Sequence, residues 1–204
     1  MMRLLLSSFG FRSPIMREKF AMVIKNDITL RNKTCLVLPY AGFNLENTFQ
    51  NEKNGLIEFG FSPENIIFVK NREDITRYIP DYIYVPGGDP FKLLDAIRKM
   101  GIMTDIVECV TKRHTVYIGV SAGADIATKS IEYVTNLEDN NVIRNMEFEA
   151  LGLIQEGILC HADHYSYSTV RVCREAVGNK ILTIADDQLL TFINGEWNYV
   201  GEQE

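Results

Sequence analysis

The stretch from Thr115 to Ala124 (TVYIGVSAGA) constrains the fold more than any other part of the chain. It begins with a β-branched and aromatic run, which predicts a buried strand. It continues into a Gly-x-Ser-x-Gly pattern centred on Ser121, and a helix-compatible run from Ala122 to Lys129 follows. A strand that turns sharply into a helix lifts the middle side chain clear of the sheet, and flanking glycines permit the tight backbone. We therefore predict that Ser121 is a nucleophile.

Strand patterns and helix patterns alternate through the first two thirds of the chain. The predicted strands are 4–8, 34–39, 66–69, 82–85 and 115–120, and the predicted helices are 15–25, 44–59, 91–100 and 103–113. Such alternation predicts an α/β fold in which helices cover both faces of a doubly wound, mostly parallel sheet. No repeat or long linker interrupts it, so residues 1–204 are expected to form a single domain.

The last third of the chain is less regular. Residues 136–147 are polar and are expected to form an exposed loop. We predict strands at 157–160 and 180–184, with a helix at 168–177 between them. Asn194-Gly195 separates two apolar runs and is the strongest hairpin signal in the sequence, because this pair suits a type I′ turn.

Composition excludes several functional classes. A net charge of −6 over 204 residues argues against nucleic-acid binding, which needs a basic surface. The apolar segment at residues 1–11 is too short to span a membrane, and no membrane association is expected. The four cysteines are scattered, with no Cys-x-x-Cys pair, so we expect no disulfide framework and a cytoplasmic location.

A serine nucleophile needs a base, and the chain has three histidines. His114 precedes the strand before Ser121 and is expected at the opposite edge of the sheet. His161 directly follows the predicted strand 157–160, which favours it as the base. His164 is the alternative. The base needs an acidic partner to hold its tautomer. Asp186 and its neighbour in sequence, Asp187, follow a strand and are candidates, although both also suit a polar turn.

Two further groups lie near these strand ends. The amides of Gly87-Gly88, opposite the serine, are suited to an oxyanion hole. The cluster His161-Ala-Asp163-His164 contains residue types that bind zinc or iron. Because no third or fourth spaced ligand accompanies it, we expect no metal and no other cofactor.

Several motifs occur in the order of one known family. They are Pro39-Tyr40-Ala41, Gly87-Gly88-Asp89, Gly119-Val-Ser121-Ala-Gly-Ala124, and Leu151-Gly-Leu153 leading to a histidine. Together they resemble the S51 serine peptidases, the peptidase E (α-aspartyl dipeptidase) and cyanophycinase-type proteins. The resemblance implies a class I glutamine amidotransferase-like fold and hydrolysis of short peptides, including dipeptides with an N-terminal aspartate.

The resemblance also implies roles for particular residues. Ser121 matches the family nucleophile, and the spacing from Leu151-Gly-Leu153 places the family histidine at His161. The family's Pro-His-Tyr context instead looks more like Asp163-His164-Tyr165. The family acid follows the next strand, at Asp186 or, less well, Asp187.

The resemblance also implies an oxyanion hole and a substrate-binding residue. The backbone amides of Gly88 and Ala122 correspond to those that form the oxyanion hole in the family. An arginine in the helix after the histidine would pair with a substrate aspartate, which gives Arg171, with Arg174 as the alternative.

The chain departs from the family at one loop. The usual Gly-Gly-Gly-Asn-Thr is replaced by Pro86-Gly-Gly-Asp-Pro90. Asp89 adds negative charge at the substrate-binding position and is expected to repel an acidic substrate.

Two other functions are compatible with these residues. One is an esterase that uses the same turn, which would require an acid between Ser121 and His161. The other is a catalytically silent domain that binds a small ligand or a partner. A homodimer is also considered.

Overall fold

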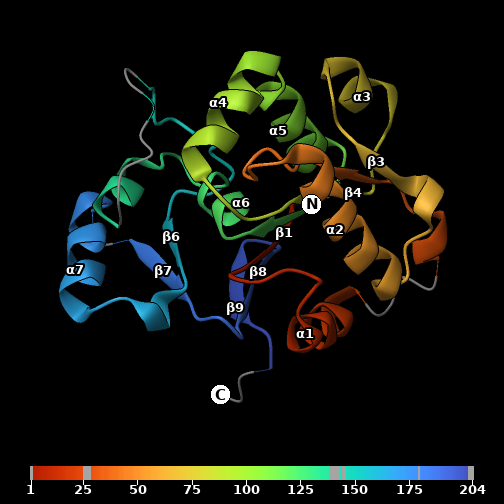
Figure 1. Cartoon of the computed structure of the whole chain (residues 1–204). Helices are drawn as coiled ribbons and strands as arrows, with labels where there is room; N and C mark the ends of the chain where they lie inside the picture. Colours follow the sequence, from red (N-terminus) through yellow and green to blue (C-terminus); the bar gives the residue numbers. More distant parts are fainter. Residues whose placement is uncertain (1, 25–28, 138–142, 144–145, 179, 202–204) are drawn as a thin grey trace.

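The computed structural model describes residues 2–24, 29–137, 143, 146–178 and 180–201 (Figure 1). Within these residues a seven-stranded sheet has the order β3-β2-β4-β5-β1-β8-β9, and β6 and β7 form a separate two-stranded sheet. The strands are β1 (Arg3–Ser7), β2 (Cys35–Val37), β3 (Ile66–Phe68), β4 (Tyr82–Val85), β5 (Val116–Val120), β6 (Gly157–Cys160), β7 (Ile181–Ile184), β8 (Leu189–Ile193) and β9 (Glu196–Tyr199). Strands β1 to β5 pair in parallel with one another, and β8 and β9 add an antiparallel edge next to β1.

Helices connect the strands and cover the sheet. They are α1 (Pro14–Ile24), α2 (Leu45–Phe59), α3 (Arg72–Arg77), α4 (Pro90–Met100), α5 (Met103–Lys112), α6 (Ala122–Asp125) and α7 (Tyr167–Ala176). Short 3₁₀ turns lie at η1 (Leu30–Asn32), η2 (Pro63–Asn65), η3 (Glu132–Asn136) and η4 (Ala162–His164). The predicted doubly wound, mostly parallel α/β fold is confirmed.

Alternation along the strands divides the core into two layers. In β1, Leu5 packs with the apolar residues of α1 and α2, whereas Leu4 and Leu6 pack with those of α4 and α5. Successive side chains of a strand point to opposite faces, so fully apolar strands such as these require a helical layer on each side. Both layers are built around the central strands β4 and β5, and this rigid centre carries the loops at the carboxyl ends of the strands.

The predicted hairpin is present. Asn194 and Gly195 both have positive φ angles, 59° and 89°, between β8 and β9. A type I′ turn requires such angles at both central residues, which Asn-Gly adopts at low cost. The hairpin places β8 beside β1 and thereby occupies that edge of the parallel sheet.

The helix after Ser121 is shorter than the sequence predicts. The helix-compatible run extends from Ala122 to Lys129, but α6 ends at Asp125. Beyond that point the carbonyl groups of residues 126–129 accept hydrogen bonds from the amides of residues 150–153. A distant segment therefore provides the donors that the next helical turn would have supplied. That segment contains the Leu151-Gly-Leu153 motif.

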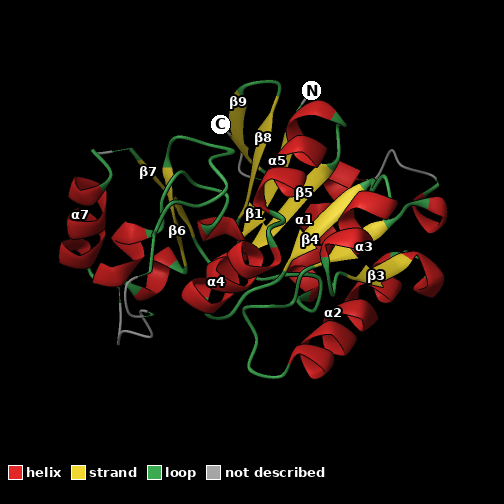
Figure 2. Ribbon diagram, turned by 90° about the horizontal axis from the view of Figure 1, so that it is seen from above, coloured by secondary structure: helices red, strands yellow, loops and turns green. Residues whose placement is uncertain are grey.

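The strands at 157–160 and 180–184 occur as predicted but do not join the main sheet. β6 and β7 pair in parallel with each other alone, and α7 lies on the outer side of this small sheet (Figure 2). Their inward side chains, including Ile158 and Ile184, belong to the same core cluster as the main sheet. The loop expected at 136–147 lies mainly outside the described residues.

Two expectations from the sequence concern His114 and membrane-spanning helices. His114 is exposed at the amino-terminal end of β5. Among the helices described, none is long and apolar enough to cross a membrane.

Replacing Gly123 by alanine should destabilise the protein strongly. A Cβ atom at this position would lie 2.0 Å from the carbonyl oxygen of Val85 in β4, so a strand would have to move. We expect a loss of about 3 kcal/mol or more in the free energy of unfolding, measured by denaturant titration. In the control, Gly101→Ala, no atom lies within 4 Å of the added Cβ and only the φ angle of 66° is unfavourable. That variant should lose about 1 kcal/mol; equal losses would contradict the close approach of α6 to β4.

Candidate active site

Ser121 lies at the bend between β5 and α6. Its φ and ψ angles are 49° and −112°, a conformation that few residues other than glycine adopt. Its backbone amide donates to the carbonyl oxygen of Ser7 at 2.8 Å, and the Tyr117 hydroxyl donates to that of Gly123 at 2.6 Å. Strain of this kind persists only where its surroundings enforce it, and it is concentrated at functional sites.

His161 follows β6 directly and also has a positive φ angle, 54°. Its backbone amide donates to the Ser8 hydroxyl oxygen at 2.9 Å, and that hydroxyl in turn donates to the carbonyl oxygen of Ile184 at 2.9 Å. The edge of the Phe9 ring packs against the imidazole, with the ring centroids 5.3 Å apart. The position of the imidazole is therefore set by both its backbone and an aromatic neighbour.

Three side chains form a continuous hydrogen-bonded series. The Nε2 atom of His161 lies 3.2 Å from the Oγ atom of Ser121, and its Nδ1 atom lies 2.5 Å from Oδ1 of Asp186. This is the geometry in which an imidazole accepts the serine proton while a carboxylate holds its other nitrogen. Asp187 is exposed and takes no part in this series. The acid follows the histidine in the chain, so the order is not Ser-acid-His, which the esterase alternative requires.

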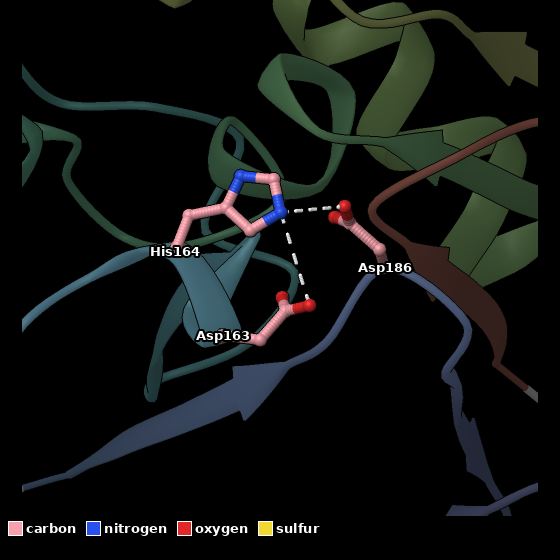
Figure 3. Close-up of side chains that lie close together, drawn as sticks. All are labelled: Asp163, His164 and Asp186. Atoms are coloured by element: carbon pink, nitrogen blue, oxygen red, sulfur yellow. Dashed lines mark ion pairs between the residues drawn. The ribbon is translucent and has the colours of Figure 1, made fainter.

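His164 contacts the acid of this series rather than the serine. Its Nε2 atom lies 2.9 Å from Oδ2 of Asp186 and 3.8 Å from Oδ2 of Asp163 (Figure 3). Asp186 thus lies between two imidazole rings, one on each carboxylate oxygen. His164 can orient Asp186, whereas the described geometry brings only His161 to Ser121.

The same three residues are the described group whose spacing suits a metal ion. One ligand atom from each of Asp163, His164 and Asp186 lies within 4.8 Å of the others. Asp163 and His164 are exposed, and the second oxygen of Asp186 is engaged by His161. Exposed groups of this type commonly carry no ion. The expected absence of a metal stays a prediction.

The loop after β4 lies directly against the serine. A Cβ atom on Gly87 would be 3.0 Å from the Cβ atom of Ser121, and one on Gly88 would be 2.3 Å from the carbonyl oxygen of Ala41. In the described residues no acceptor receives the amide hydrogens of Gly88 and Ala122. Two unengaged amides on either side of a nucleophile are suited to stabilising negative charge on a carbonyl oxygen.

A cavity of about 760 Å³ opens above Ser121. Its described lining residues are Phe9, Ala41, Gly42, Phe43, Gly88, Asp89, Pro90, Phe91, Ser121, Asp125, Val134, Leu137, Cys160, His161, His164, Tyr165 and Thr169. A volume of this size accommodates a short peptide. Of the two residues expected to bind substrate, Asp89 lies in this wall and Arg171 does not.

The structure does not bring Arg171 to the site. Its side chain is 65% exposed, and its Nε atom lies 3.3 Å from an oxygen of Glu175 on the same helix. Arg174, the alternative, is also exposed and outside the described lining. Helix α7 turns Cys173 inward instead, so the arginines on either side of it face solvent.

Two residues with evident roles at the site were not predicted from the sequence. Ser8 positions the backbone of His161, and only its place after a strand hinted at this. Asp125, on α6, is 8% exposed and lies in the cavity wall. Burial raises the pKa of its carboxyl group to about 8, because the charged form loses hydration. A Gly-x-Ser-x-Gly pattern carries no information about a carboxyl group two residues beyond it.

The fold and the site together define a serine hydrolase built on an α/β sheet. Residues 4–200 match the sequence model described as Peptidase family S51. The chain therefore belongs to this family. The resemblance noted in the sequence is confirmed.

Individual relatives agree with this assignment. The chain is 31% identical over 164 residues to peptidase E of Haemophilus influenzae, covering 78% of this chain and 72% of the relative. It is 35% identical over 129 residues to a protein of Drosophila melanogaster described as a probable alpha-aspartyl dipeptidase, covering 63% of this chain and only 52% of the relative. A peptidase E protein structure from Listeria monocytogenes superposes with a TM-score of 0.77 at 22% identity, over 98% of both chains, which supports the fold.

Replacing Asp125 by asparagine should stabilise the protein at neutral pH. The folded-state pKa of this carboxyl group is raised above its unfolded value, so the folded state retains a proton that the unfolded state releases. Its contribution to stability is therefore greatest below pH 4 and falls as the pH rises toward 8. Relative to the parent, Asp125→Asn should gain about 1 kcal/mol or more, about 2–4 °C in Tm, at pH 8. A gain that is no larger at pH 8 than at pH 4 would contradict a buried, uncompensated carboxyl group.

Proposed function

We propose that this protein hydrolyses short peptides, with Ser121 as nucleophile, His161 as general base and Asp186 as the residue that holds the imidazole. The observation that carries the proposal is the unbroken series of contacts from Ser121 Oγ through both nitrogens of His161 to Asp186. Ser121 follows β5 of the main sheet, whereas His161 and Asp186 follow β6 and β7 of the small sheet. Ser121 and His161 lie in the wall of the cavity. A silent binding domain would not require that alignment.

The steps follow from this geometry. Ser121 Oγ attacks the carbonyl carbon of the scissile bond while His161 Nε2 accepts its proton. The amides of Gly88 and Ala122 stabilise the negative oxygen of the tetrahedral intermediate. The imidazolium then transfers its proton to the leaving amine, which breaks the C–N bond and leaves an acyl group on Ser121. A water molecule, activated by the same imidazole, releases the acid product.

The aspartyl dipeptidase activity that the name of the Drosophila relative gives is not part of this proposal. It needs a cation that pairs with the substrate carboxylate, and Arg171 is directed to solvent. We also propose a cytoplasmic location, because all four cysteines are free and buried. A homodimer likewise remains a proposal, which sedimentation of the purified protein would test.

A fluorophosphonate probe should label the protein at Ser121. The probe reacts only with a serine whose proton a neighbouring base accepts. Labelling, followed by intact mass spectrometry, should disappear in Ser121→Ala and persist in Ser168→Ala, a control with an exposed serine outside the cavity wall. Absence of labelling in the parent protein would favour the silent binding domain.

The two histidines should differ in their effect on turnover. We expect His161→Ala to lower kcat/KM for a dipeptide by about 10³-fold, because the proton acceptor is lost. His164→Ala should lower it by no more than about tenfold, since His164 contacts Asp186 and makes no hydrogen bond with Ser121. Steady-state kinetics with one substrate checks both. A larger loss in His164→Ala than in His161→Ala would reverse the assignment of the base.

A further inference from the structure

The wall of the active-site cavity contains two carboxyl groups and, among its described residues, no lysine or arginine that would compensate their charge. Besides the two histidines, its described residues include the carboxyl groups of Asp89 and Asp125 and no lysine or arginine. A cation does lie close by: the Nζ atom of Lys92 is 4.0 Å from the ring centroid of Phe43, a residue of the rim. An acidic substrate side chain entering this cavity would meet like charge, and a basic one would meet opposite charge.

Asp89 presents an oxygen that has no partner among the described residues. Its Oδ1 atom accepts hydrogen bonds from the amides of Phe91 and Lys92, at 2.9 and 3.0 Å, and so caps α4. Its Oδ2 atom is buried, and no described residue donates to it. Buried polar atoms in proteins are almost always hydrogen-bonded, so an unpaired oxygen on a residue of the cavity wall is a candidate acceptor for a ligand donor. The two hydrogen bonds to Oδ1 fix the orientation of the carboxyl group.

The place of Asp89 in the chain restricts what that donor is. Asp89 directly follows Gly88, which lines the same cavity as Ser121. In a peptide cleaved after its first residue, a single carbon atom separates the α-ammonium group from the scissile carbonyl carbon. A carboxylate beside the oxyanion amides is therefore within reach of that ammonium group.

Asp125 lies elsewhere in the wall, one helical turn after Ser121. It is almost fully buried, and the rings of Phe9, Phe43 and Phe91 line the same cavity. Aromatic faces pack against the aliphatic stem of a long basic side chain, and a buried carboxyl group pairs with its charged end. A substrate aspartate has no long aliphatic stem to pack against these rings, and its carboxylate would not pair with that of Asp125.

We propose that the active site selects short peptides with a basic N-terminal residue, Asp89 binding the α-ammonium group and Asp125 the charged end of the side chain. This inference rests on the proposed peptidase function. It assigns a substrate class opposite in charge to aspartyl dipeptides. The raised pKa of Asp125 agrees with it, since a buried carboxyl group without its cationic partner holds its proton.

The test compares Lys-Ala, Leu-Ala and Asp-Ala dipeptides as substrates of the full chain. We expect kcat/KM to decrease in that order, with Lys-Ala exceeding Asp-Ala by about tenfold or more. Equal values, or a preference for Asp-Ala, would overturn the proposal while leaving the peptidase function intact. Loss of both probe labelling and all turnover would instead count against the peptidase function itself.

Isosteric variants separate the two carboxyl groups. Asp125→Asn should lower kcat/KM for Lys-Ala by about tenfold more than it lowers kcat/KM for Leu-Ala. Asp89→Asn should lower both substrates to a similar extent, because both carry the α-ammonium group. The control, Asp95→Asn, alters a residue of α4 that pairs with Lys99 outside the cavity wall and should change neither. Loss of Leu-Ala turnover in Asp125→Asn equal to that of Lys-Ala would overturn the side-chain assignment.

Discussion

One buried hydroxyl group joins the two sheets beside the series formed by Ser121, His161 and Asp186. Ser8, which follows β1 and is 2% exposed, accepts a hydrogen bond from the His161 amide and donates one to the carbonyl of Ile184. The carboxyl ends of β6 and β7 are thereby tied to the main sheet. Because Ser121 belongs to the main sheet while His161 and Asp186 follow strands of the small one, their alignment depends on this junction.

Features with a local physical cause could be predicted from the sequence. The Asn194-Gly195 turn has one favourable backbone solution, and glycines around Ser121 permit a bend that other residues resist. The alternation of apolar strands and amphipathic helices was sufficient for the fold class. Features that depend on partners distant in the chain could not be predicted. The helix after Ser121 ends early because a segment some 25 residues later donates to carbonyls that would otherwise have continued it.

The position of β6 and β7 is a case of the same kind. Their apolar runs specify strands but not which sheet edge they join. The edge beside β1 is taken by β8, whose hairpin pairs antiparallel with it, so these two parallel strands pair with each other.

At the site, the sequence left two candidates for the base, His161 and His164, and two adjacent aspartates for the acid. Only the orientation of these side chains in the structure distinguishes the members of each pair. Arg171 lies outside the described cavity wall for a related reason. Helical periodicity shows which residues share a face, but the burial of Cys173 decides which face of α7 turns inward.

The loop after β4 links substrate charge to the chemical step. A carboxylate one residue from an oxyanion amide opposes the negative charge that develops on the scissile carbonyl oxygen. If the substrate supplies an ammonium group to Asp89, that opposing charge is neutralised in the transition state. The free energy of the contact between Asp89 and the ammonium group then stabilises the transition state as well as the bound substrate, so it raises kcat as well as affinity. Under the proposal, Asp89, which replaces the asparagine usual in the family, makes rapid hydrolysis depend on the ammonium group of the substrate.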